Sequence, residues 1–332
     1  MSERLLDVTD LSIEIETRSG PATIVAGIDL HVDKGETLGI VGESGCGKSL
    51  TMLSLLRLLP NKIRVAGGRA EFQGRDLLKL SRRELRQVRG GRIGFVFQDP
   101  MTSLNPVMKI GAQLSEPLIY HRDMSRADAW KRSGELLRLV GIPGAEERLH
   151  SYPHELSGGM RQRVMIAAGL ACEPELLIAD EPTTALDVTI QAQIVDLVKE
   201  LRKRLGMSVV WITHDLALIA GLADRICVLY AGTVVEDAPV DQLFATPGHP
   251  YTRGLLASIP RVSGSTMARL SSIGGTPPEP GRRPSGCAFA PRCPLAQEVC
   301  RQNAPALQPM QGSSNAHRVA CHFAGRLMSE AA

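Results

Sequence analysis

The sequence predicts an α/β fold: a parallel core sheet, an antiparallel sheet at its edge, a helical insertion, and a small cysteine-containing extension at the C-terminus. The core prediction depends on five short, almost continuously apolar runs, namely ETLGIVG, RIGFVFQ, ELLIADEP, MSVVWITHD and RICVLYAG. Such runs are typical of strands that are buried on both faces. Because helical segments separate the runs, we expect the strands to be parallel.

Length, composition and charge limit the number of domains and the function classes that the chain can belong to. The chain has 332 residues, which suits two unequal domains, and its 43% of apolar residues supplies a core. The 38 Lys and Arg against 35 Asp and Glu leave a net charge of +3, too small to indicate nucleic-acid binding. No apolar run approaches the roughly 18 residues of a membrane span, and the acidic N-terminus is unlike a targeting peptide. We therefore expect a cytoplasmic chain that does not cross a bilayer and binds no nucleic acid.

The remaining segments differ in the pattern of their apolar and polar residues. Residues 4–17 and 28–32 alternate apolar and polar side chains, as half-buried strands of an antiparallel edge sheet do. Residues 110–172 instead show helical spacing, which predicts the insertion. After residue 237 the chain is rich in Pro and Gly, so we expect a linker that leads to a small appended domain.

A phosphate-binding loop is predicted at GESGCGKS, which fits G-x-x-x-x-G-K-[ST] and stands between the apolar run TLGIV and the helical run LTMLSLLRLL. Backbone N–H groups and the helix N-terminus attract phosphates, Lys48 reaches the outer phosphates, and the Ser49 hydroxyl ligates Mg²⁺. Cys46 is isolated from the other six cysteines, so we interpret it as a spacer. The residues expected to contact the nucleotide are Gly42, Glu43, Ser44, Gly45, Cys46, Gly47, Lys48, Ser49 and Leu50.

Two carboxylates end the apolar run LLIADEP, where a parallel sheet presents its ligands. We expect Asp180 to hold Mg²⁺ through water. Glu181 is expected to orient or deprotonate the water that attacks the γ-phosphate, because in-line attack needs a positioned nucleophile.

Between these motifs, LSGGM resembles the LSGGQ signature of the ATP-binding cassette (ABC) family of transport ATPases, with one residue changed. Ser157, Gly158 and Gly159 open a helix and can clamp a phosphate from its other side. A single chain that binds one nucleotide does not need both a phosphate-binding loop and a second phosphate clamp. The resemblance implies why both are present: two cassettes stack head to tail, and each signature closes the P-loop site of the other.

Further positions of the family pattern are present, and the resemblance covers residues 5–236. It implies that Gln98, in FVFQDP, is the Q-loop residue, which contacts the nucleotide and Mg²⁺ and links the site to the insertion and the transmembrane partner. Asp187, in Ala185-Leu186-Asp187, belongs to the D-loop and to the nucleotide site. His214, in WITHD, is the switch histidine, which holds the attacking water together with Glu181.

The resemblance also gives domain boundaries. Residues 1–98 and 173–236 form the RecA-like and antiparallel-sheet ATPase core, residues 99–172 the helical signature subdomain, and residues 237–332 the extension. One position departs from the pattern: the family stacks adenine on an aromatic residue before its second strand, and residues 9–30 contain no aromatic side chain. Aliphatic contact from Ile24 or Val25 is the expected substitute.

The C-terminal residues from 248 onward, the tail, indicate one subgroup of the family. GHPYTRGLLASIP, GCAFAPRCPLAQEVC and HRVACH resemble the C-terminal extension of ATPases from dipeptide and oligopeptide importers. The resemblance implies the first ATPase of a pair: an ATP-hydrolysing subunit, peripheral on the cytoplasmic face of the bacterial cell membrane. Its partners are a second, non-identical ATPase, two transmembrane permease subunits and, indirectly, a periplasmic or extracellular solute-binding protein. No residue is expected to touch the cargo.

Four tail cysteines stand in a C-x5-C-x6-C-x20-C arrangement: Cys287, Cys293, Cys300 and Cys321. Cys172 and Cys227 lie in apolar segments and are expected in the core. Disulfides are disfavoured in a reducing compartment, so the four point to metal. Zinc sites usually use closer pairs and an iron–sulfur cube accepts a wider loop, but the spacing alone leaves both open. Related peptide-importer ATPases imply a [4Fe–4S] cluster with a structural role, with Zn²⁺ as the alternative.

Two other functions share the core motifs. Soluble cassette proteins of DNA repair or translation carry long insertions or tandem cassettes, whereas only 108 residues lie between Lys48 and Ser157 here. A regulatory cassette that binds ATP without cleaving it does not need Glu181. We therefore expect a transport ATPase.

Overall fold

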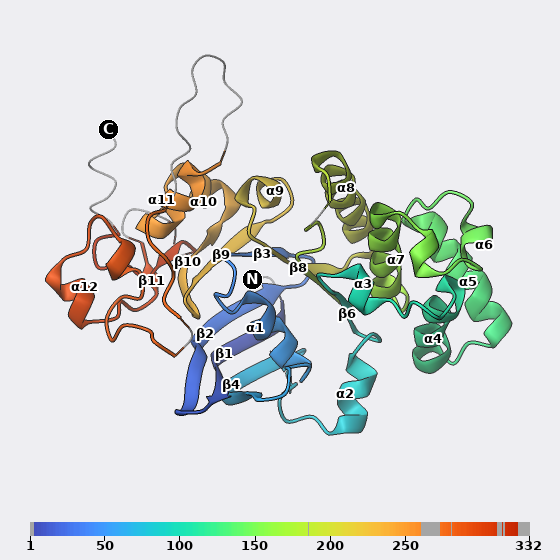
Figure 1. Ribbon diagram of the computed structural model, residues 1–332, viewed down its shortest axis with the longest axis horizontal. Helices are drawn as coiled ribbons and strands as arrows, with labels where there is room; N and C mark the ends of the chain where they lie inside the picture. Colours follow the sequence, from blue (N-terminus) through green and yellow to red (C-terminus); the bar gives the residue numbers. More distant parts are fainter. Residues whose placement is uncertain are drawn as a thin grey trace, which may run out of the picture. The chain divides into compact units, whose positions relative to one another are not determined.

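The computed structural model describes residues 3–184, 186–259, 273–279, 281–310, 314 and 316–324 (Figure 1). These residues divide into two compact units, and each unit is described by itself. The first unit comprises Glu3, Val32–Thr37 and Lys79–Ile212. The second unit comprises Arg4–His31, Leu38–Leu78 and the described residues from Thr213 onward.

The second unit contains the antiparallel sheet that the alternating N-terminal pattern predicts. Its strand order is β2-β1-β4-β5, and β4 pairs antiparallel with both β1 and β5. Leu6, Leu11 and Ile13 of β1 are fully buried, and the alternation changes phase between Leu6 and Leu11, where the pairing with β4 shifts its register. The strands are β1 (Arg4–Thr17), β2 (Gly20–Asp33), β4 (Ile63–Phe72) and β5 (Arg75–Asp76).

Core strands of the second unit run in the order β3-β9-β10-β12-β11. β3 and β9 are parallel, and the later strands are joined by antiparallel pairs. The strands are β3 (Thr37–Val41), β9 (Arg225–Tyr230), β10 (Thr233–Pro239), β11 (Gln308–Pro309) and β12 (Arg318–Val319). The helices are α1 (Lys48–Leu55), α9 (Leu216–Ala220), α10 (Val240–Ala245), α11 (Pro250–Ala257), η2 (Ala290–Arg292) and α12 (Glu298–Gln302).

The linker expected after residue 237 is wrong for the stretch up to Ala257. α10 and α11 occupy it, and the Gly and Pro residues that indicated a linker serve the entry into α11. His249 caps this helix, Pro250 takes its first position, and Tyr251 follows. The side chains of His249 and Tyr251 are almost completely buried, with 1% and 0% exposed. This segment is therefore part of the core of the second unit.

The first unit holds three parallel strands in the order β6-β7-β8, with helices around them. β7 and β8 are buried along their whole length, as the apolar runs predict. The strands are β6 (Ile93–Val96), β7 (Leu176–Asp180) and β8 (Ser208–Thr213).

The predicted helical insertion is present in the first unit (Figure 1). Its core includes Leu136, Leu137 and Val140. Among the helices of the described residues, none is both long enough and apolar enough to cross a membrane. The helices of this unit are α2 (Arg82–Val88), α3 (Pro100–Ser103), α4 (Ile110–Arg122), α5 (Arg126–Leu139), α6 (Ala145–Arg148), η1 (Pro153–Glu155), α7 (Gly158–Leu170) and α8 (Val188–Leu205).

Candidate active site

The phosphate-binding loop connects β3 to α1 in the second unit and curls around a lysine ammonium. Lys48 is 4% exposed, and its Nζ donates to the carbonyls of Gly42, at 2.8 Å, and Glu43, at 3.1 Å. Gly47 precedes α1 with a φ of +99°, and a Cβ there would lie 2.9 Å from Val25 Cγ2. Only glycine fits this position without strain. The loop therefore holds a cation at its centre and begins a helix at its end, which suits phosphate.

Side chains around the loop differ in their exposure. Ser44 and Gly45 are exposed at its tip, whereas Cys46 is buried and burial raises the pKa of its thiol. A buried, protonated thiol suits the role of a spacer. Val25 is fully buried beside Gly47, so of the two aliphatic residues suggested for the adenine only Ile24, which is half-buried, has exposed surface.

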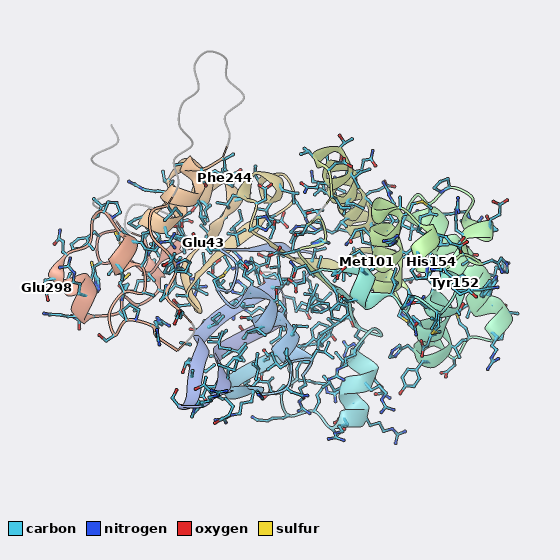
Figure 2. All side chains as sticks on the ribbon, viewed as in Figure 1. Glu43, Met101, Tyr152, His154, Phe244 and Glu298 are labelled. Atoms are coloured by element: carbon cyan, nitrogen blue, oxygen red, sulfur yellow. The ribbon has the colours of Figure 1, made fainter. Side chains whose placement is uncertain are left out.

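Two residues that the sequence did not single out contact the loop at Glu43, which Figure 2 labels. The Tyr251 hydroxyl accepts the backbone N–H of Glu43 at 2.8 Å. Arg292 donates both terminal nitrogens to the Glu43 carboxylate, at 2.6 and 2.9 Å. Arg292 is separated from Glu43 by 249 positions, so no local pattern could indicate this pair.

Carboxylates end β7 in the first unit. Asp180 is 5% exposed, and Glu181 has a φ of +44°, a strained value for a residue other than glycine. Gln98 Nε2 donates to Glu181 Oε2 at 3.3 Å, and the Thr184 hydroxyl donates to the same oxygen at 2.9 Å. The structure thus brings together Gln98 and Glu181, which the sequence assigned to one site. The amide and the hydroxyl fix the direction of the Glu181 side chain.

The signature residues form an exposed helix N-terminus in the first unit. Ser157 caps α7 by accepting the Met160 N–H at 3.3 Å, and both Ser157 and Gly158 are exposed. Unpaired N–H groups in the first turn of a helix attract phosphate, so this end could bind one from outside the chain. Asp187 caps α8 in the same way, accepting the Ile190 N–H at 2.9 Å. Ala185 of the expected D-loop lies outside the described residues.

His214, in the second unit, follows β8 and is exposed. Its neighbour Asp215 caps α9 by accepting two backbone N–H groups, from Ala217 and Leu218. The structure places His214 at the end of a buried strand, where the sequence predicts it. Its role as a switch stays a prediction.

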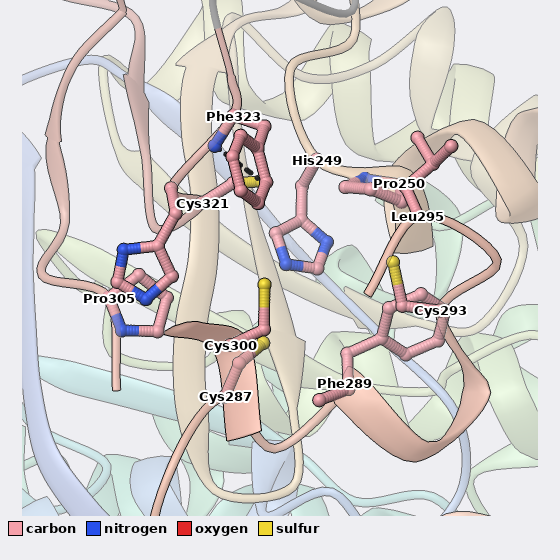
Figure 3. A pocket seen from close by; sticks show the side chains of 12 residues that line it. His249, Pro250, Cys287, Phe289, Cys293, Leu295, Cys300, Pro305, Cys321 and Phe323 are labelled. Carbon is pink, nitrogen blue, oxygen red and sulfur yellow. Dashed lines mark hydrogen bonds between the residues drawn. The ribbon is translucent and has the colours of Figure 1, made fainter. Parts of the chain in front are cut away.

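The four tail cysteines line one pocket in the second unit (Figure 3), which His249 and Phe289 also line. The Cys287 N–H donates to the Cys300 carbonyl at 2.7 Å, which joins two of the cysteine segments. Burial raises the pKa of the Cys287 and Cys293 thiols, and it raises that of Cys321 to about 11.

Among the described residues, no group of three or more His, Cys, Asp or Glu side chains is placed to hold a metal ion. Cys172 and Cys227 are buried, as predicted for core cysteines, and burial raises the pKa of both.

Comparison with known proteins identifies two regions of the chain. The profile described as "ABC transporter" matches residues 25–184, which include the phosphate-binding loop and the signature. The profile described as "Oligopeptide/dipeptide transporter, C-terminal region" matches residues 235–300, which include three of the four tail cysteines.

Curated relatives match almost the whole chain. A probable peptide ABC transporter ATP-binding protein of Sinorhizobium fredii is 52% identical over 96% of this chain and 95% of its own length. The oligopeptide transport ATP-binding protein OppD of Bacillus subtilis is 51% identical over 95% of this chain and 88% of its own. The dipeptide transport ATP-binding protein DppD of the same species is 49% identical over 96% and 94%.

Solved structures share the fold. The ATP-binding cassette MJ0796, in a dimeric post-hydrolysis state bound to ADP and Pi, matches with a TM-score of 0.64 and 29% identity over 71% of this chain and 98% of its own. The cbiO1 protein of Clostridium perfringens, part of the cbiONQ ABC transporter complex, matches with a TM-score of 0.63 and 29% identity over 73% and 91%. These findings confirm the resemblance that the signature and the tail indicated. The chain belongs to the ABC transporter ATPases of the oligopeptide and dipeptide transport family.

Proposed function

We propose that the chain hydrolyses ATP to power a bacterial ABC importer for dipeptides, oligopeptides or related small solutes. The observation that carries the proposal is the phosphate-binding loop wrapped around Lys48, in a chain that also has the C-terminal region of peptide transporters. The relatives OppD and DppD carry oligopeptide and dipeptide transport in their names.

Each site residue has a separate role in ATP hydrolysis in this proposal. Lys48 and the N–H groups of the loop bind the phosphates, as do the first N–H groups of α1. Ser49, Asp180 and Gln98 are the residues that would hold Mg²⁺, and the ion, when bound, would neutralise phosphate charge. Glu181, whose direction Gln98 and Thr184 fix, takes a proton from the attacking water, and His214 holds that water.

The signature acts in trans, and the chain works as half of a pair. The exposed N-terminus of α7, with Ser157, Gly158 and Gly159, supports this because it offers N–H groups to a phosphate held by another subunit. Asp187 caps α8, whose Ile190 packs against Gly159 of the signature. The partner is a second, non-identical ATPase, and the solved MJ0796 cassette is dimeric.

Permease subunits dock on the helical part of the first unit. This part exposes large apolar side chains: Met101, labelled in Figure 2, is 59% exposed, Tyr120 53% and Val107 80%. They come from α3, from α4 and from the loop between these helices, and exposed apolar side chains of this kind favour an interaction site. The chain is then peripheral on the cytoplasmic face of the membrane, and a periplasmic or extracellular binding protein supplies the solute.

We further propose that Cys287, Cys293, Cys300 and Cys321 would hold a [4Fe–4S] cluster. Binding would have to draw the thiols together, because no three of them are placed for a metal ion in the described residues. Four thiols that line one pocket match the four cysteine ligands that such a cluster takes. Iron binding must displace protons, because burial keeps the thiols of Cys287, Cys293 and Cys321 protonated. The cluster would cross-link the tail and thereby stabilise it. Zinc is the alternative because it binds the same sulfur donors.

Replacing Glu181 by glutamine tests the function. The amide keeps the shape of the side chain but cannot accept the proton, so turnover should fall by roughly 10²–10⁴-fold while ATP affinity is kept. Turnover is measured on the complex assembled with the partner ATPase and permeases in vesicles, and affinity on the purified chain.

Glu175→Gln is the matched control, since Glu175 lies directly before β7 and pairs with Arg92 at the surface, at 2.8 Å. The control should retain wild-type turnover. Near-normal hydrolysis by Glu181→Gln would contradict the assignment of the base.

A further inference from the structure

The contact between Arg292 and Glu43 is a partly buried, bidentate ion pair. Only 4% of the Arg292 side chain is exposed, against 28% of Glu43. The guanidinium also donates to the Tyr230 hydroxyl at 3.3 Å and to the Gly274 carbonyl at 2.9 Å. Its centre lies 5.7 Å from the Tyr230 ring. This geometry leaves the guanidinium little freedom, and a bidentate arginine–carboxylate pair fixes both partners in direction.

Tyr251 makes the second contact, and its ring is anchored in an aromatic cluster. The ring is fully buried, with centroids 4.7 Å from Tyr230 and 5.5 Å from Phe289. Its hydroxyl accepts the Glu43 N–H. The backbone and the side chain of this loop residue are therefore held at the same time by residues outside the loop.

Both contacts come from segments that line the cysteine pocket. Arg292 is the last residue of η2 and directly precedes Cys293. Tyr251 donates its N–H to His249 Nδ1 at 3.0 Å, and His249 and Phe289 line the pocket (Figure 3). The extension and the loop are thus joined by short chains of hydrogen bonds and ring contacts within one compact unit.

We propose that Arg292 and Tyr251 are positioning residues for the phosphate-binding loop, through which the cysteine-bearing extension sets the affinity of the loop for the phosphates of ATP. Arg292 neutralises the carboxylate of Glu43, which otherwise places a negative charge on the loop that receives a triphosphate. Tyr251 fixes the first peptide of that loop. The inference rests on the proposed function, since it assigns ATP to this loop.

A double-mutant cycle between Arg292 and Glu43 tests the charge part of the proposal. The equilibrium affinity of the full chain for a fluorescent ATP analogue is measured in wild type, Arg292→Gln, Glu43→Gln and the double variant. Arg292→Gln should bind about 10-fold more weakly, because the unpaired Glu43 carboxylate then repels the triphosphate, and tenfold corresponds to about 1.4 kcal/mol of such repulsion. In the Glu43→Gln background the same substitution should change the affinity by less than about twofold, because no unpaired carboxylate remains.

The salt dependence of the affinity distinguishes an electrostatic role of Arg292 from a merely structural one. Screening should reduce the defect of Arg292→Gln between low salt and about 1 M salt, where the Debye length falls to about 3 Å. Arg301→Gln is the matched control, because Arg301 lies in α12 of the same extension and pairs at the surface with Glu298, at 3.5 Å. It should bind the analogue like wild type. A defect that persists at full size in the double variant would overturn the proposal.

Tyr251→Phe provides an independent test of the proposal if Arg292→Gln does not fold. This substitution retains the ring in its cluster and removes only the hydroxyl that accepts the Glu43 N–H, so the affinity should fall about threefold. Wild-type affinity in a folded Tyr251→Phe would refute the role of Tyr251.

Lys48→Ala separates failure of the inference from failure of the proposed function. If wild type and Lys48→Ala bind the analogue equally, the loop is not the ATP site and the function itself is wrong. If Lys48→Ala loses binding while Arg292→Gln and Tyr251→Phe bind like wild type, only the positioning role is wrong.

Discussion

Replacing Glu236 by alanine should destabilise the second unit by about 3–5 kcal/mol, because it removes a buried carboxylate that accepts hydrogen bonds from two buried backbone N–H groups. Glu236 lies in β10 and is fully buried. Its carboxylate accepts the N–H groups of Gly248, at 2.6 Å, and His249, at 2.9 Å, and lies 2.7 Å from His317 Nε2. Alanine leaves these two buried backbone donors unpaired, and at about 1–3 kcal/mol each their cost is of the stated size.

Thermal unfolding of the full chain, followed by circular dichroism, measures the effect. At about 2–4 °C per kcal/mol, Glu236→Ala should lower Tm by roughly 6–20 °C. Glu236→Gln keeps the shape but turns one acceptor into a donor, so about 1–3 kcal/mol is expected. Glu14→Ala is the control: it removes an exposed pair with Arg64, at 2.8 Å, and should cost less than about 1 kcal/mol. If the Glu236→Ala and Glu14→Ala variants unfold at the same temperature, the network contributes nothing and the reasoning fails.

Two further predictions concern assembly and the cysteines. The purified chain should hydrolyse ATP slowly, and turnover should rise when the partner ATPase and permeases are added, because the signature is useful only in trans; rapid hydrolysis by a verified monomer would contradict this. Anaerobically purified protein should be brown and contain about four irons per chain, and Cys293→Ser should lose them; colourless protein with one zinc would decide for the alternative.

The buried strands could be predicted from the sequence because their environment leaves a local pattern. β7 and β8 are buried at every position and consist almost entirely of apolar residues. β10 escaped prediction, although it pairs with β9, which the apolar run RICVLYAG predicted. It carries Glu236 and Asp237, two buried carboxylates whose charge is typical of exposed positions, and their partners lie far along the chain.

The same distinction applies to the site. Phosphate binding by the loop depends on consecutive residues, so Gly42–Ser49 could be found from spacing alone. The residues that hold Glu43 in place, Arg292 and Tyr251, are distant in sequence and have no motif of their own. The burial of Val25, which excludes it as an exposed adenine contact, likewise depends on packing against Gly47.

Buried ion pairs make the stability of the sheet that carries the phosphate-binding loop depend on the extension. Asp237, 2% exposed, accepts from Arg225 of β9 at 2.6 Å and from Arg318 of β12 at 2.5 Å, while Glu236 binds the turn before α11 and lies beside His317. A truncation after β10 would leave both carboxylates buried without most of their partners, at a cost of several kcal/mol. The unit would then lose stability for a reason unrelated to nucleotide binding. The contribution of the extension to ATP affinity therefore has to be measured with single substitutions at Arg292 and Tyr251, which leave Glu236 and Asp237 paired.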